Sequence, residues 1–138
     1  MTEAYIYDAV RTPRGKGRPD GALHSLSPVE MGARVLTALN DRTGFADHEI
    51  EDVVFGVGDG VLDQGSNLAR SALLYAGFPQ DIAGATVSRF CSSGLDAVNA
   101  SAARIMAGQG DLMVAGGVEM MSIIPIAATG GPNGSDAR

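Results

Sequence analysis

The sequence predicts an α/β domain built on a mostly parallel sheet. Short apolar runs rich in β-branched residues alternate with longer amphipathic segments, and capping or turn residues stand at most of the junctions. The expected order is strand, helix, strand, helix, strand, helix, strand (βαβαβαβ), which places the helices on the faces of the sheet. A chain of 138 residues is long enough for one such domain with a buried core.

Four segments are expected to form the strands. Residues 4–10 (AYIYDAV) are rich in aromatic and β-branched side chains, and residues 51–57 (EDVVFGV) form a short apolar run next to glycine. Residues 85–90 (ATVSRF) form the third strand. Residues 111–118 (DLMVAGGV) form the fourth, and their apolar character is typical of a buried parallel strand.

The first helix has a clear start signal. Ser27 is suited to the N-cap, Pro28 to the first helical position, and Glu30 completes a capping box. The apolar residues that follow share one face of this helix: Met31, Val35, Ala38 and Leu39.

Two further helices follow the second and third strands. One is expected from about residue 67 to residue 76, where Gly77 and Pro79 stop it. The other begins just after residue 90 and ends near residue 107, before two glycines. Its apolar side chains are interspersed mostly with Ala, Ser and Asn. This composition predicts a helix that is buried nearly all round, at the centre of a larger protein.

Charge and cysteine content narrow the function classes. The net charge of −6 argues against nucleic-acid or anionic-membrane binding, since both favour basic surfaces. No apolar stretch approaches membrane-spanning length. With a single cysteine and no leader pattern after Met1, a cytoplasmic protein without disulfides is expected. One basic cluster is either a solvated loop or a patch for a phosphate-bearing ligand or partner subunit: Arg11, Arg14, Lys16 and Arg18.

Cys91 is the candidate nucleophile. It lies where the third strand gives way to the third helix, and the first turn of a helix offers unpaired N–H groups and the positive end of the dipole. Such a position favours the thiolate and can hold a developing oxyanion. The alternative is a buried, unreactive cysteine, and local physics leaves both open.

The block around Cys91 resembles the active-site block of the thiolase family. The matching residues are Cys91, Ser92, Ser93, Gly94, Ala115, Gly116, Gly117, Glu119, Met121 and Ser122. Residues 8–15 resemble the family's first strand and turn, residues 50–56 its second strand, and residues 68–79 the helix before the catalytic strand. The resemblance covers essentially the whole chain and implies the first half of a thiolase-like fold.

The resemblance also implies an activity, that of an acetyl-CoA C-acyltransferase or acetyltransferase. Cys91 would attack a 3-ketoacyl-CoA, acetyl-CoA would leave, and coenzyme A would then remove the shortened acyl group from sulfur. In reverse, two acetyl-CoA molecules would condense. The backbone N–H of Cys91 would form part of an oxyanion hole. Coenzyme A and acyl-CoA are expected as substrates, with no permanently bound cofactor and no metal.

Two features depart from the family pattern. Ser88 stands where many members have Asn, which suggests a change in local hydrogen bonds. Thiolases are also much longer chains. In the family, a second half supplies an acid/base Cys and a His motif, and a loop domain binds coenzyme A. Residues 1–122 are therefore interpreted as the N-terminal core half and residues 123–138 as the start of the loop domain or a linker. The chain alone is expected to be inactive, and its partners are the remaining part of the thiolase and a second subunit, in a homodimer or tetramer.

Other candidates for chemistry are weaker. His24 and His48 lie in polar stretches and are expected at the surface rather than beside Cys91. Gly56, Gly58 and Gly60 do not have the dinucleotide-binding spacing and are interpreted as turn glycines.

Two alternative functions stay open beside the thiolase hypothesis. One is a ketoacyl synthase-type condensing enzyme, which also places a Cys at a helix start. The other is a non-catalytic subunit of a split assembly that binds coenzyme A or lipid. Residues 11–27 resemble degradative thiolases more than biosynthetic ones, which indicates fatty-acid and lipid degradation.

Overall fold

β1 (Asp52–Gly56) is the middle strand of a three-stranded sheet and has a parallel partner on each side. The computed structural model describes residues 3–45 and 47–128. β2 (Ala83–Val87) and β3 (Met113–Gly117) flank β1, so that Val54 lies between Ala85 and Ala115. The β1 side chains from Val53 to Phe55 are at most 2% exposed. A fully buried central strand of this kind is typical of parallel sheets.

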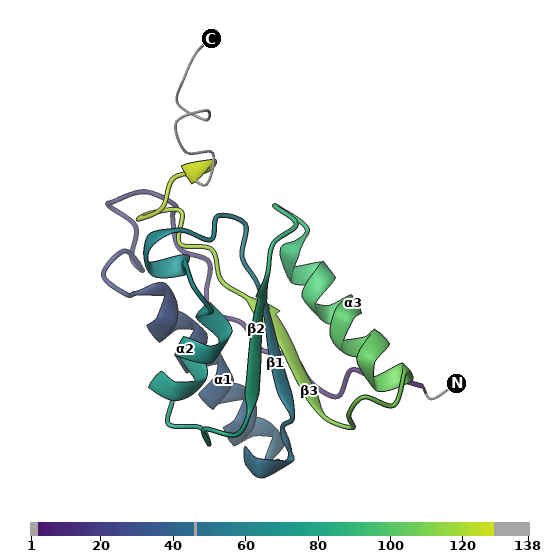
Figure 1. Cartoon of the computed structure of the whole chain (residues 1–138). Helices are drawn as coiled ribbons and strands as arrows, with labels where there is room; N and C mark the ends of the chain where they lie inside the picture. The colour runs from purple at the N-terminus through teal and green to yellow at the C-terminus, as the bar shows by residue number, and fades with distance from the viewer. Residues whose placement is uncertain (1–2, 46, 129–138) are drawn as a thin grey trace.

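Helices cover both faces of the sheet. α1 (Pro28–Thr43) and α2 (Leu68–Tyr75) lie on one face, and α3 (Ser93–Met106) lies on the other (Figure 1). Two short 3-10 helices, η1 (Asp47–Glu49) and η2 (Leu62–Gln64), lie in the loops. The predicted α/β class with a parallel sheet is confirmed. No helix in the described part of the chain is both long and apolar enough to cross a bilayer.

The helix ends follow the local signals in the sequence. Ser27 caps α1 by accepting a hydrogen bond of 3.1 Å from the backbone N–H of Glu30. The Glu30 carboxylate pairs instead with Arg34 at 2.7 Å, one turn further on, so the described structure has only the Ser27 half of the expected capping box. Asn67 caps α2, and Gly77 follows it with a φ of 82°, a left-handed conformation that glycine adopts without strain.

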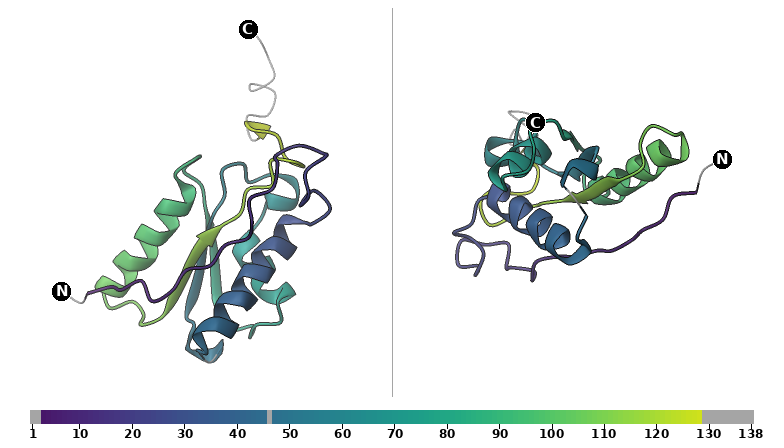
Figure 2. Two further views of the ribbon diagram at one scale, coloured as in Figure 1. Left: turned by 180° about the vertical axis from the view of Figure 1, so that it is seen from behind. Right: turned by 90° about the horizontal axis from the view of Figure 1, so that it is seen from below.

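The prediction of a first strand at residues 4–10 is wrong for the described structure. The segment is extended, but it joins no strand. It runs from beside the end of α3, past β3, to the loop before α1 (Figure 2). Tyr5 and Ile6 are each 80% exposed. Local β-propensity cannot supply a neighbouring strand, and without one the segment has no ladder of hydrogen bonds to complete.

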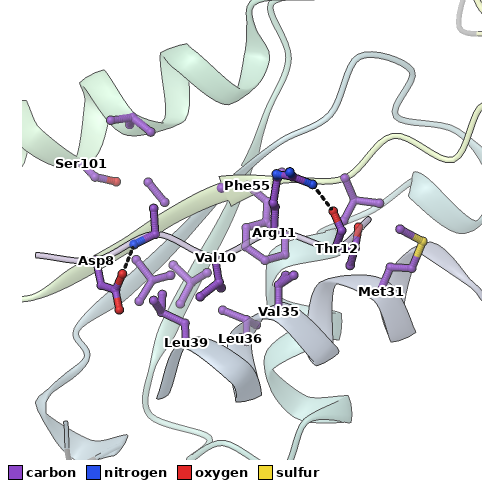
Figure 3. A pocket seen from close by; sticks show the side chains of 18 of the residues that line it. Asp8, Val10, Arg11, Thr12, Met31, Val35, Leu36, Leu39, Phe55 and Ser101 are labelled. Carbon is purple, nitrogen blue, oxygen red and sulfur yellow. Dashed lines mark hydrogen bonds between the residues drawn. The ribbon is translucent and has the colours of Figure 1, made fainter. Parts of the chain in front are cut away.

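An apolar groove lies between this N-terminal segment and the sheet, and the segment is held to α1 by an ion pair of 2.7 Å between Asp8 and Arg42. Its volume is about 1150 Å³, and β3, α1 and α3 form its other walls. Figure 3 shows Val35, Leu36 and Leu39 of α1 on one side and Ser101 of α3 on the other. The face of α1 that the sequence predicts as apolar therefore lines the groove in large part, whereas the residues of α1 that are buried are Pro28, Gly32, Ala33 and Leu36.

α3 is less buried than its composition predicts. It packs on the sheet with one side only, and its buried residues are Ser93, Ala97 and Ser101. Leu95 is 65% exposed and Met106 is 41% exposed. The described chain has no further layer over the outer side of α3 (Figure 1). Most of residues 123–138, expected as a linker or the start of a loop domain, lie outside the described residues.

Candidate active site

Cys91 is exposed in the turn that joins β2 to α3. β2 ends at Val87, and the helix begins at Ser93, two residues after the cysteine. Ser92 takes the N-cap position, but its side chain makes no capping hydrogen bond. Neither the thiol nor the backbone N–H of Cys91 has a hydrogen-bond partner among the described residues. The thiol is thus open to a reagent from solvent and next to the first turn of a helix.

The residue before Cys91 has an uncommon backbone conformation. Phe90 has a φ of 49°, in the left-handed region that bulky side chains rarely occupy. Its ring is 75% exposed, so side-chain packing does not account for the conformation. Two backbone hydrogen bonds close the turn around it, from Ser92 N–H to Arg89 C=O at 3.1 Å and from Ser93 N–H to Phe90 C=O at 3.0 Å. The chain therefore turns sharply just before the thiol.

Ser93 adds side-chain hydrogen bonds to the same turn. Its residue is only 3% exposed, and its hydroxyl accepts a hydrogen bond of 2.8 Å from the backbone N–H of Arg89. The hydroxyl oxygen lies 2.6 Å from the carbonyl oxygen of Phe90 and 3.2 Å from that of Val57. Because a hydroxyl has one proton, the shorter contact to Phe90 is the main acceptor. Ser93 thus bonds to peptide groups on both sides of the left-handed residue.

Gly56 allows the start of α3 to lie directly on the sheet. A Cβ at this position would stand 2.2 Å from the carbonyl carbon of Ser93 and 2.4 Å from the nitrogen of Gly94. Those are backbone atoms, so they could move aside only if the start of α3 shifted. Gly56 is therefore required by a close backbone approach, and it is the last residue of β1 and not the turn glycine that was expected.

The loops beside the Cys91 turn are tied together by a polar network. The amide of Gln64 is fully buried and donates to the carboxylate of Glu119 at 2.7 Å and to the carbonyl of Asp59 at 2.9 Å. Glu119 also accepts a hydrogen bond of 2.6 Å from the N–H of Gly58. The carbonyl of Gly58 in turn accepts a hydrogen bond of 3.2 Å from Ser88. The network thus reaches the segment that leads into the turn.

Sequence reasoning missed part of this arrangement. Ser93 and Glu119 belong to the motif, but Ser93 also contacts the carbonyl of Val57, 36 positions away, and Glu119 accepts from Gly58, 61 positions away. The motif does not include Gln64, and a glutamine between turn residues carries no signal that it is buried. The hydroxyl of Ser88 donates to Gly58, 30 positions away.

The other predicted residues lie apart from this chemistry. His48 is exposed in η1, whereas His24 is half-buried and its Nδ1 has no partner, which differs from the surface position expected for it. No hydrogen bond or ion pair in the described ranges joins either histidine to Cys91. Nor do the described residues contain a cluster of metal-ligating side chains. The four cations of the basic cluster are exposed, as expected of a solvated loop: Arg11, Arg14, Lys16 and Arg18.

The apolar groove and the Cys91 turn are separate places on the molecule. Residues that line the groove include Glu119, Met121 and Ser122 of the motif but neither Cys91 nor its neighbours in the turn. The described part of the chain therefore presents the thiol on an open surface. A pocket around the sulfur would need further walls.

Comparison with known proteins places this arrangement in a family. Residues 4–135 match the family model described as the N-terminal domain of thiolase. A steroid 3-ketoacyl-CoA thiolase of Mycobacterium tuberculosis is 44% identical over 128 residues, which cover 93% of this chain and 31% of that protein. A 3-oxoadipyl-CoA/3-oxo-5,6-dehydrosuberyl-CoA thiolase of Escherichia coli is 45% identical over 126 residues, which cover 91% of this chain and 31% of that protein.

A solved structure gives the same result. The crystal structure of the Bacillus anthracis acetyl-CoA acetyltransferase is similar with a TM-score of 0.70 and 42% sequence identity. The match covers 74% of this chain and 26% of that chain. The chain thus spans about a third of the length of the curated relatives that it matches.

Proposed function

This chain belongs to the thiolase family, and on that premise we propose that its complete protein transfers acyl groups to and from coenzyme A through a thioester on Cys91. The observation that carries the proposal is the position of the thiol, exposed and at the start of α3, within the segment that matches the family model. A buried thiol without access would have contradicted it.

The chemistry needs a nucleophile and a site for negative charge. The thiolate of Cys91 attacks the carbonyl carbon of an acyl thioester, and the oxygen becomes negatively charged in the tetrahedral intermediate. Backbone N–H groups that are fixed in advance stabilise such an oxyanion. The N–H of Cys91, which has no partner among the described residues, is the donor that we assign to this role.

The substrate class follows from the relatives. The two thiolases compared above are named for steroid 3-ketoacyl-CoA and for 3-oxo dicarboxylic acyl-CoA substrates. Both are thioesters with a 3-oxo group. We propose that the complete protein cleaves a 3-ketoacyl-CoA with coenzyme A, in lipid degradation, or condenses two acetyl-CoA molecules in the reverse direction.

Further parts are needed for turnover. The relatives are about three times as long as the matched segment, since 126 to 128 residues cover 31% of each. Within the described residues, no histidine or second cysteine stands beside Cys91 to exchange protons. We propose that the remaining part of the thiolase supplies these groups and covers the apolar groove, and that the complete protein is a homodimer or tetramer.

The test is acylation of the 138-residue chain with acetyl-CoA and with p-nitrophenyl acetate. The second compound is a small acyl donor that does not depend on a coenzyme A-binding site. The proposal expects one acetyl group on Cys91 by peptide mass spectrometry, at a rate well above that of the same chain unfolded in urea. Cys91→Ser is the control. A native chain that is acylated no faster than the unfolded chain would overturn the catalytic role. If that chain nevertheless bound acyl-CoA, the result would favour a non-catalytic subunit.

A further inference from the structure

We infer that Ser93 is a positioning residue that aims the backbone N–H of Cys91 as the oxyanion donor. This inference rests on the proposed function, because it assumes that Cys91 is acylated. It assigns to a buried hydroxyl, two residues beyond the nucleophile, a role in acyl transfer that the thiol itself does not perform.

The peptide bond between Phe90 and Cys91 is held in one orientation by Ser93. The carbonyl oxygen of this peptide is held 2.6 Å from the hydroxyl oxygen of Ser93 and 3.0 Å from the backbone nitrogen of Ser93. The described residues contain no cis peptide bond, and in a planar trans peptide the C=O and N–H point in opposite directions. Fixing the Phe90 carbonyl toward Ser93 therefore directs the Cys91 N–H away from Ser93.

The backbone conformation of Phe90 opposes this orientation of the peptide, so the orientation needs support. A φ of 49° at Phe90 is unfavourable for a bulky residue, and such conformations persist only where the surroundings impose them. Ser93 forms hydrogen bonds to the peptide groups on both sides of Phe90, because its hydroxyl accepts from the Arg89 N–H at 2.8 Å and donates to the Phe90 carbonyl. Without that hydroxyl, only backbone bonds would oppose rotation of the peptide.

Ser93 is itself held in place by its neighbours. Its backbone lies against Gly56 so closely that a methyl group at position 56 would overlap it, and its side chain is 3% exposed. Its hydroxyl also lies 3.2 Å from the carbonyl of Val57 in the adjoining loop. The turn is thereby fixed to the end of the central strand, so the N–H of Cys91 is oriented before any acyl group arrives.

Two reactions of the same sulfur separate positioning from general stability. In acylation by p-nitrophenyl acetate, the Cys91 thiolate forms a C–S bond, an oxyanion develops, and p-nitrophenolate leaves with the electron pair of the broken C–O bond. Alkylation by iodoacetamide displaces iodide and develops no oxyanion. A misdirected N–H should slow the first reaction and leave the second nearly unchanged. Loss of folded structure would affect both.

The experiment measures both rates in the 138-residue chain with Ser93→Ala, Ser93→Thr and the matched control Ser92→Ala. Ser92 is exposed and its side chain makes no capping bond. We expect Ser93→Ala to slow acylation about tenfold or more. This effect should be smaller than that of removing an oxyanion donor, because the Cys91 N–H is misdirected but still present. Alkylation should change less than about threefold, Ser93→Thr should recover most of the acylation rate, and Ser92→Ala should match the wild type.

The outcomes are distinguishable. If wild-type acylation equals that of the urea-unfolded chain, the proposed function fails. If wild-type acylation is fast but Ser93→Ala slows both reactions equally, or neither, the positioning role fails alone. Circular dichroism and a urea midpoint verify folding of each variant. Should Ser93→Ala not fold, the comparison is made in a Phe90→Asn background, because Asn tolerates the left-handed conformation. There, equal acylation rates with and without the Ser93 hydroxyl would overturn the inference.

Discussion

The buried amide of Gln64 donates a hydrogen bond of 2.7 Å to the carboxylate of Glu119, although 55 positions separate the two residues. The oxygen of the same amide accepts a hydrogen bond from the backbone N–H of Met120. One fully buried side chain thus joins the loop after β1 to the loop after β3. Both loops lie at the edge of the sheet where the strands end, next to the turn that carries Cys91.

Gln64→Leu tests this junction. The substitution keeps a side chain of similar volume but leaves the Met120 N–H without its partner and removes a hydrogen bond from the Glu119 carboxylate. An unsatisfied buried group costs about 1–3 kcal/mol, and a hydrogen bond to a charged group is worth a similar amount, so we expect the free energy of unfolding to fall by about 3 kcal/mol in urea titrations. Gln109→Leu, at an exposed glutamine, should change stability by less than about 0.5 kcal/mol. Equal losses in the two variants would contradict the account.

Gly56→Ala should be far more damaging than Gly94→Ala. At position 56 a Cβ would stand 2.2–2.4 Å from backbone atoms of Ser93 and Gly94, whereas at position 94 it would meet nothing within 4 Å. We expect Gly56→Ala to destabilise the fold by about 3 kcal/mol or more, since the helix must shift. Gly94→Ala lies in the first turn of α3 and should stabilise by up to about 1 kcal/mol. Thermal unfolding followed by circular dichroism measures both.

The two helix caps should differ in strength. The hydroxyl of Ser27 accepts one hydrogen bond at the start of α1, so Ser27→Ala should cost about 1 kcal/mol. Asn67 caps α2 and also donates to the carbonyl of Gly84 at 2.6 Å, so Asn67→Ala should cost about 2 kcal/mol. Asn67→Asp retains the capping oxygen and loses the donor, and its cost should be intermediate. If Ser27→Ala proved the more costly change, the hydrogen bond from Asn67 to the Gly84 carbonyl of β2 would contribute nothing to stability.

The chain alone should not sustain catalysis. Cys91 is expected to accept one acetyl group and then stop, because no acid/base side chain among the described residues contacts it. A spectrophotometric assay of acetoacetyl-CoA with coenzyme A should show at most one turnover per chain. Continued thiolysis by the purified 138-residue polypeptide, absent in Cys91→Ser, would mean that this segment holds its own proton-transfer group.

Local signals predicted local structure well. Ser27 and Gly77 mark helix ends because a cap is decided within a few residues, and the structure has both. The strand expected at residues 4–10 shows the limit of such signals, because a strand needs a neighbour that local sequence does not provide.

The same limit applies to the candidate site. The position of Cys91 between β2 and α3 followed from the order of elements and from the family motif. The role of Gln64 did not, since it depends on how segments 55 and 56 positions apart meet in space. The bonds of Ser93 to the turn are local, but its contact with Val57 depends on a segment 36 positions away. Whether a polar side chain is buried depends on how such distant segments pack against one another.

The central place of β1 in the sheet sets an order for events during protein synthesis. β1 leaves the ribosome first of the three strands, yet its neighbours are made about 30 and 60 residues later. Until Gly117 has emerged, one edge of this apolar strand is open to water or to other nascent chains. The sheet is completed from the middle outward, and the segment that finishes it is the one that delivers Glu119 to the loop beside the thiol.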